Sequence, residues 1–169
     1  MRAKKLALGA VLAAILMVAQ VVLSFLPNIE LCSLLIILYT LCFTPAVAIW
    51  AVAVFVILQG LLYGFGIWWF SWLYIWPVLI LFAWLFRRNT SAVLWAVIAG
   101  VFGLCFGALC ALPYFITGGF YAGISYWFAG IPFDISHCVG NFVLTLALFK
   151  PLYKCFNSIY TKEFLGVSY

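Results

Sequence analysis

Apolar runs separated by short polar or Gly/Pro-containing breaks fill the chain almost from end to end. A helix of about 20 apolar residues is long enough to cross the hydrocarbon core of a bilayer. The pattern therefore predicts an all-α membrane protein, with six transmembrane helices forming a single domain over residues 1–169. The predicted spans cover about 6–25, 31–44, 46–63, 70–86, 92–112 and 133–149.

The first run follows Met-Arg-Ala-Lys-Lys, a basic start that a secretory signal peptide would also have. Its apolar stretch, Leu6 to Phe25, is longer than the roughly 7 to 15 residues of a signal core, and further apolar runs follow at once. We therefore interpret it as the first transmembrane helix. The second run, Leu31 to Phe43, is short for a hydrocarbon core of about 30 Å.

Proline and glycine mark several of the predicted breaks. We expect Pro113 to Gly123 to form a loop, and Gly130-Ile131-Pro132 to split the last apolar segment into a short interfacial piece and the sixth span. The fifth predicted span carries Ala99, Gly103 and Gly107, a four-residue repeat of small side chains. Such a repeat lets the backbone of a neighbouring helix approach closely.

Composition and charge support the membrane assignment and suggest an orientation. The chain is 70% hydrophobic and 7% charged, whereas about a quarter of the residues in soluble domains are charged. If the N-terminus is cytoplasmic, six spans put both termini and every basic residue on the cytoplasmic side, as the positive-inside rule requires. This distribution argues against nucleic-acid binding. The eight basic residues are Arg2, Lys4, Lys5, Arg87, Arg88, Lys150, Lys154 and Lys162.

Motifs for catalysis, nucleotide binding or metal binding do not occur in the sequence. It has no Walker loop, no Gly-x-Ser-x-Gly, no His-Glu-x-x-His and no Cys-x-x-Cys pair. We expect its six cysteines to act as small apolar residues, with Cys138 of interest because it adjoins the only histidine. The sequence predicts neither an enzyme nor a bound cofactor.

The stretch Gly130 to Asn141 places polar side chains inside an apolar run. In a helix, Asp134, His137 and Asn141 are spaced i, i+3, i+7 and share one face. A charged group in hydrocarbon costs several kcal/mol, so such residues are functional candidates by default. The alternative is structural: Asp134 caps the helix or complements its dipole, and His137 simply bonds to it.

Other polar and aromatic residues fall at the same predicted outer level. The aromatic residues have two interpretations: an interfacial belt, or the wall of a pocket for a flat, amphipathic ligand. The predicted substrate-binding residues are Asn28, Glu30, Gln59, Tyr63, Trp68, Trp72, Tyr114, Trp127, Asp134, His137 and Asn141.

The first predicted helix has a smooth face of small side chains. Ala3, Ala7, Ala10 and Ala14 recur at i, i+4, i+7 and i+11. Such a face serves either packing within the chain or docking of a separate helix.

Three segments, 26–39, 107–114 and 130–142, resemble the substrate-binding S components of energy-coupling factor transporters. The resemblance implies a six-helix subunit of the bacterial cell membrane that captures a vitamin near the outer face. It also implies two further kinds of partner: a coupling transmembrane subunit, docked on an Ala-x-x-x-Ala face that Ala10 and Ala14 match, and two cytoplasmic ATPase subunits. The absence of an ATP-binding motif from this chain fits that division of labour.

Within that family the chain looks closest to the group associated with cobalamin uptake. His137 would then be either a cobalt ligand, since neutral imidazole suits transition metals, or a hydrogen-bond partner, which we favour. Pantothenate, riboflavin or a pyridoxine-like compound are alternative substrates. A rod-shape-type structural membrane protein and a stand-alone membrane enzyme are alternatives from other classes.

Overall fold

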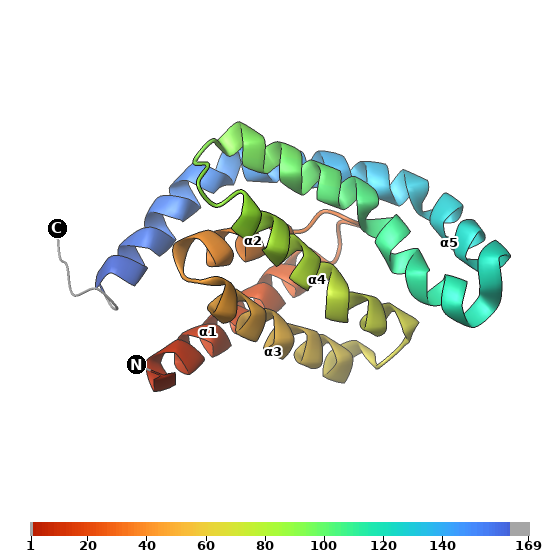
Figure 1. Ribbon diagram of the computed structural model, residues 1–169, viewed down its shortest axis with the longest axis horizontal. Helices are drawn as coiled ribbons and strands as arrows, with labels where there is room; N and C mark the ends of the chain where they lie inside the picture. The colour runs from red at the N-terminus through yellow and green to blue at the C-terminus, as the bar shows by residue number, and fades with distance from the viewer. Residues whose placement is uncertain (1, 163–169) are drawn as a thin grey trace.

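The computed structural model describes residues 2–162, and all regular secondary structure in that range is helical (Figure 1). Residues 163–169 of the predicted C-terminal tail lie outside the described residues. The helices are α1 (Arg2–Val22), α2 (Cys32–Cys42), α3 (Pro45–Tyr63), α4 (Ile67–Leu85) and α5 (Ala92–Tyr160).

Helix α5 is a hairpin rather than one continuous rod. Its backbone leaves the helical region at Gly119, where φ is 78° and ψ is −176°. Glycine reaches a positive φ without the steric penalty of a Cβ. The chain reverses there, so the first arm (92–118) and the second arm (120–160) run antiparallel (Figure 1).

The predicted breaks around this reversal are wrong in detail. The expected loop at 113–123 is helical on both sides of Gly119, and the expected division at 130–132 is absent, so the second arm begins well before residue 133. A proline removes one backbone donor, and a membrane helix tolerates this because neighbouring helices hold its course. Pro113 and Pro132 therefore lie inside the two arms.

The two arms of α5 pack closely through the predicted small-residue repeat. A Cβ added at Gly103 would come within 2.9 Å of the His137 carbonyl oxygen, and one at Gly100 within 3.3 Å of the Cys138 carbonyl oxygen. A Cβ at Gly107 would collide with the carboxylate of Asp134. The missing Cβ atoms at these three glycines of the first arm therefore allow the two arms to approach this closely.

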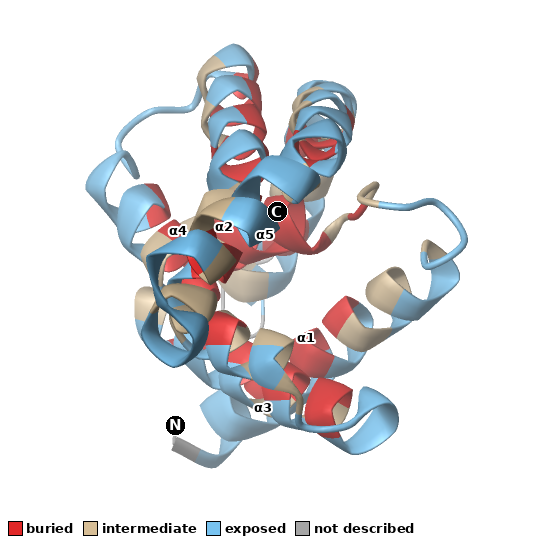
Figure 2. Cartoon of the chain, turned by 90° about the vertical axis from the view of Figure 1, so that its right-hand side faces the viewer, coloured by how far each residue is buried: buried red, intermediate tan, exposed pale blue. Residues whose placement is uncertain are grey.

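Helix α2 forms the centre of the molecule. It has 11 residues, nearly all of them buried, and it packs against α3, α4 and α5. The longer helices turn their buried residues inward and their exposed residues outward (Figure 2). Because α2 is short, space is left beyond its N-terminal end. The irregular segment 23–31 occupies part of this space and lines a pocket there.

The outer surface is apolar. Helices α1, α3, α4 and α5 are each long and apolar enough to cross a membrane. Their outward faces carry large hydrophobic side chains, including Val18, Leu61, Phe70, Val93 and Phe133. A surface of this kind is what a multi-pass membrane protein presents to lipid.

The segments that carry the basic residues lie toward one end of the molecule. The start of α1, the loop between α4 and α5, and the last part of α5 are spread along its left-hand side in Figure 1. We call this the basic end. The turn between α3 and α4 and the reversal at Gly119 lie at the opposite end (Figure 1).

Candidate functional site

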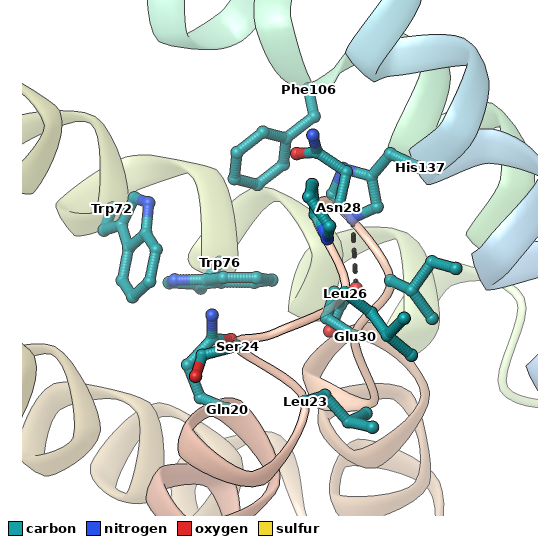
Figure 3. Close-up of a pocket in the computed structure, with 12 residues that line it drawn as sticks. Gln20, Leu23, Ser24, Leu26, Asn28, Glu30, Trp72, Trp76, Phe106 and His137 are labelled. Carbon is teal, nitrogen blue, oxygen red and sulfur yellow. Dashed lines mark hydrogen bonds and ion pairs between the residues drawn. The ribbon is translucent and has the colours of Figure 1, made fainter.

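A pocket of about 200 Å³, which we call the main pocket, lies at the C-terminal end of α1 (Figure 3). Segment 23–31, helix α4 and both arms of α5 complete its walls. The lining residues are Gln20, Leu23, Ser24, Leu26, Pro27, Asn28, Ile29, Glu30, Trp72, Trp76, Phe106 and His137.

One wall of the main pocket is a chain of aromatic rings in mutual contact. The indoles of Trp72 and Trp76 meet edge to face, with ring centroids 5.6 Å apart. Phe106 follows at 5.8 Å from Trp76, and its ring meets the imidazole of His137 at 4.9 Å. Edge-to-face contacts are a preferred geometry for aromatic pairs. The wall therefore presents a largely apolar surface of ring faces and ring edges to the pocket.

At the His137 end of this wall, Glu30 and His137 form a buried polar pair. Glu30 Oε1 lies 3.1 Å from His137 Nε2, and Glu30 Oε2 accepts a hydrogen bond of 2.8 Å from the Ser33 backbone N–H (Figure 3 shows the pair as a dashed line). Ser33 lies in the first turn of α2, where the helix dipole favours a negative charge. Glu30 and His137 are 107 positions apart in the sequence, so only the fold brings them together.

The electrostatic balance keeps Glu30 ionised. Burial by itself would raise the pKa of Glu30, but the hydrogen bonds from His137 and Ser33 hold it below the ordinary value of 4.5. Because a carboxylate only accepts, the proton shared in this contact is carried by His137 Nε2. Nδ1 is buried and has no hydrogen-bond partner among the described residues.

Asn28 lies in the irregular segment over the main pocket. It is the one non-glycine residue of the described chain with a positive φ, 58°. Asparagine adopts this left-handed conformation more readily than most side chains do. Residues held in such conformations tend to cluster at binding sites. The left-handed backbone at Asn28 therefore supports a binding role for segment 23–31, which lines the main pocket.

A second pocket, which we call the side pocket, adjoins the first. It has a volume of about 270 Å³ and shares Gln20, Ser24 and Trp72 with the main pocket. Its other lining residues are Gln59, Tyr63 and Trp68. The ring of Trp68 meets that of Trp72 edge to face at 5.2 Å. Trp72 thus lines both the main pocket and the side pocket.

The structure brings most of the predicted site residues to these two pockets. Asn28, Glu30, Trp72 and His137 line the main pocket. Gln59, Tyr63, Trp68 and Trp72 line the side pocket.

The remaining predicted residues line neither pocket. Asp134 accepts a hydrogen bond of 2.9 Å from the Gly107 N–H, and Asn141 donates one of 3.2 Å to the Ser33 hydroxyl. Asp134 therefore joins the two arms of α5, and Asn141 joins α5 to α2. Tyr114 stacks on Tyr126 at 4.1 Å near the reversal, and Trp127 is partly exposed on the second arm.

Eight lining residues were not predicted from the sequence: Gln20, Leu23, Ser24, Leu26, Pro27, Ile29, Trp76 and Phe106. Trp76 and Phe106 lie in uniformly apolar runs, where nothing in the pattern separates a pocket wall from a lipid-facing ring. Gln20 and Ser24 do have a signal, because they are the polar side chains of the apolar run Leu6 to Phe25. Their position at its C-terminal end would have pointed to the pocket.

Comparisons of the chain with family models, with curated proteins and with solved structures give no match. The described residues contain no group of three or more His, Cys, Asp or Glu side chains able to hold a metal ion. Arguments about function therefore rest on the pockets, the surfaces and the charge distribution of the chain itself.

Proposed function

We propose that this chain is the substrate-binding S component of an energy-coupling factor importer, and that it captures a vitamin in the main pocket. The observation that carries the proposal is the pocket itself: an aromatic wall ends at a buried Glu30–His137 pair inside an otherwise apolar helical protein. Polar groups are expensive to keep in such surroundings, which favours a binding role for them.

The proposed topology has six spans with both termini in the cytoplasm. Helices α1 to α4 and the two arms of α5 supply the six helical segments. The positive-inside rule favours a cytoplasmic location for the basic end. The Gly119 end then faces outward, so that a ligand enters the pockets from outside the cell.

Helix α1 supports the proposed coupling partner. Ala10 and Ala14 are exposed, whereas Leu12, Ala13 and Leu16 on the other face are buried in the core that α1 shares with α3. Because Ala10 and Ala14 are exposed, this face does not pack against the other described helices of the chain. A smooth exposed face lets a helix of the coupling subunit approach closely. The two ATPase subunits act through that partner.

Pocket size bears on which vitamin is bound. Sites for drug-sized ligands span about 300 to 1,000 Å³, and the main pocket is smaller at about 200 Å³. Cobalamin, our first candidate, requires segment 23–31 to move aside. Pantothenate, riboflavin or a pyridoxine-like compound requires a smaller movement. Because Glu30 occupies His137 Nε2, we favour a hydrogen-bonding role for His137 over cobalt ligation.

Direct binding measurements test the proposal. The purified protein in phosphatidylcholine nanodiscs is titrated with cobalamin, cobinamide, pantothenate, riboflavin and pyridoxine by calorimetry. We expect saturable binding of at least one compound, lost in Trp72→Ala and retained in Trp84→Ala. Trp84 is a matched control because it lies far along α4, partly exposed and covered by Arg87. A structural protein of the rod-shape type would bind none of the panel.

A further inference from the structure

We infer that the two pockets select an organic cation with a flat ring over neutral and anionic compounds of the same shape. This inference names the chemical class of the ligand and rests on the proposed role of the main pocket as the binding site. It is carried by the charges and the rings that line the pockets.

The lining of both pockets contains one acidic side chain, Glu30, and no lysine or arginine. The chain does have basic residues, but the segments that carry them lie at the basic end (Figure 1). An anionic ligand in the main pocket would therefore lie close to the Glu30 carboxylate, and the only basic side chain in the lining, His137, already contacts Glu30. Desolvating an unbalanced charge is strongly unfavourable. Carboxylate and phosphate ligands, pantothenate among them, are disfavoured on this ground.

Glu30 itself leaves room for a positive ligand. Its carboxylate is held by an imidazole N–H and a backbone N–H, and among the described residues its only ion-pair partner is His137. Each carboxylate oxygen accepts one of these hydrogen bonds and keeps a further lone pair, so a cationic ligand can donate to Glu30 without displacing either donor. This arrangement favours a positive charge near the floor of the pocket.

The aromatic wall adds a second attraction for a cation. Trp68, Trp72 and Trp76 follow one another along α4 with successive ring contacts. Indole is the side chain that binds cations best through its π face, and the attraction grows when water is excluded. Trp72 borders both pockets, so a flat ring placed against it contacts the main pocket on one side and the side pocket on the other.

The side pocket suits an uncharged polar arm of the same ligand. Gln59, Tyr63 and Ser24 offer an amide and hydroxyl groups there, with no charged side chain among the lining residues. The ligand class is thus a ring-bearing cation with a neutral polar substituent.

Three probes with one ring and different charges test this class: 1-methylnicotinamide (positive), nicotinamide (neutral) and nicotinate (negative). Each is titrated by tryptophan fluorescence quenching at pH 7.5 in phosphatidylcholine nanodiscs, with empty nanodiscs as the blank. We expect 1-methylnicotinamide to bind at least about tenfold more tightly than nicotinamide, which corresponds to about 1.4 kcal/mol. Nicotinate should bind most weakly.

Glu30→Gln isolates the charge, because glutamine keeps the shape and an accepting oxygen. The preference for 1-methylnicotinamide over nicotinamide should fall to about threefold or less. Asp134→Asn is the matched control: it also removes a buried acid, but one that lines neither pocket, and it should retain most of the preference.

The outcomes separate this inference from the proposed function. Equal affinity for the cationic and neutral probes, or tightest binding of nicotinate, overturns the cation preference, and Trp72-dependent binding would still support the pocket as a site. Binding of a vitamin without binding of any probe also overturns only the inference. Failure of every probe and every vitamin to bind overturns both.

Discussion

His137 Nε2 lies 3.1 Å from Glu30 Oε1, although 107 positions separate the two residues along the chain. The contact joins the second arm of α5 to the segment that leads into α2. It therefore links the stability of the fold to the floor of the main pocket, because both depend on the same pair.

Replacing His137 with alanine should destabilise the protein by about 3 kcal/mol, since removing one partner of a buried pair leaves the other charge uncompensated. Glu30→Gln should cost less, because the amide still accepts from His137. In the double variant His137→Ala with Glu30→Gln, the cost should be smaller than the sum of the two single changes. Unfolding in mixed micelles, followed by circular dichroism, measures all three. Additive losses would show that the pair does not couple.

Gly103→Ala should destabilise the helical hairpin by about 1 to 3 kcal/mol through overpacking. The added methyl would press on the backbone at His137, which cannot move as a side-chain end would. Gly130→Ala is the control, because a Cβ there meets nothing within 4 Å and alanine favours a helix over glycine by up to about 1 kcal/mol. We expect Gly130→Ala to be neutral or stabilising in the same assay. Equal effects at both positions would contradict the close approach of the two arms.

Ala10→Leu and Ala14→Leu should abolish vitamin uptake by the assembled transporter and leave vitamin binding to the isolated chain unchanged. Both positions are exposed on α1, so the larger side chains block only a helix that docks from outside. Ala147→Leu, an exposed alanine on α5, serves as the control and should retain uptake. Uptake and co-purification of the coupling subunit are measured in cells that express all components. Normal uptake by both α1 variants would remove the docking role.

Lowering the pH should weaken the fold through Glu30. Its pKa in the folded protein lies below the ordinary value of 4.5, so the unfolded chain takes up the proton first as the pH falls. The stabilising contribution is complete above that ordinary value and is lost as the pH falls through the folded pKa. Melting temperatures measured from pH 7 to pH 3 should fall below about pH 4.5. The fall should be shallower in Glu30→Gln.

The sequence predicts the helical class because long apolar runs have few alternatives in a membrane protein. It also predicts that Asp134, His137 and Asn141 share a face, and the structure buries all three on the inward side of α5. The predicted loop 113–123 contains the reversal at Gly119 but is too long, and the predicted break at 130–132 is absent. Pro113 and Pro132 are strong breakers in water and weaker ones among packed membrane helices. Gly119 provides the turn through a backbone conformation that no pattern of hydrophobicity encodes.

The candidate site was harder to predict because its chemistry is assembled across helices. Glu30, Trp72 and His137 stand out as polar or amphipathic side chains, and spacing alone cannot show that they border one pocket. Trp76 and Phe106 carry no such mark in the sequence. Tyr114 and Trp127 resemble them in type but lie in the hairpin near its reversal. Only the packing of α4 against α5 distinguishes a pocket wall from an aromatic residue elsewhere.

The shortness of α2 has a consequence for transport. A helix of 11 residues is about 16 Å long, roughly half of a hydrocarbon core of about 30 Å. If the chain is the importer subunit that we propose, a ligand at the N-terminal end of α2 would already lie about halfway across the barrier. Toward the C-terminal end of α2, the rings of Tyr39, Phe43 and Phe156 pack against one another. In the proposed importer, release into the cell would require those rings to part.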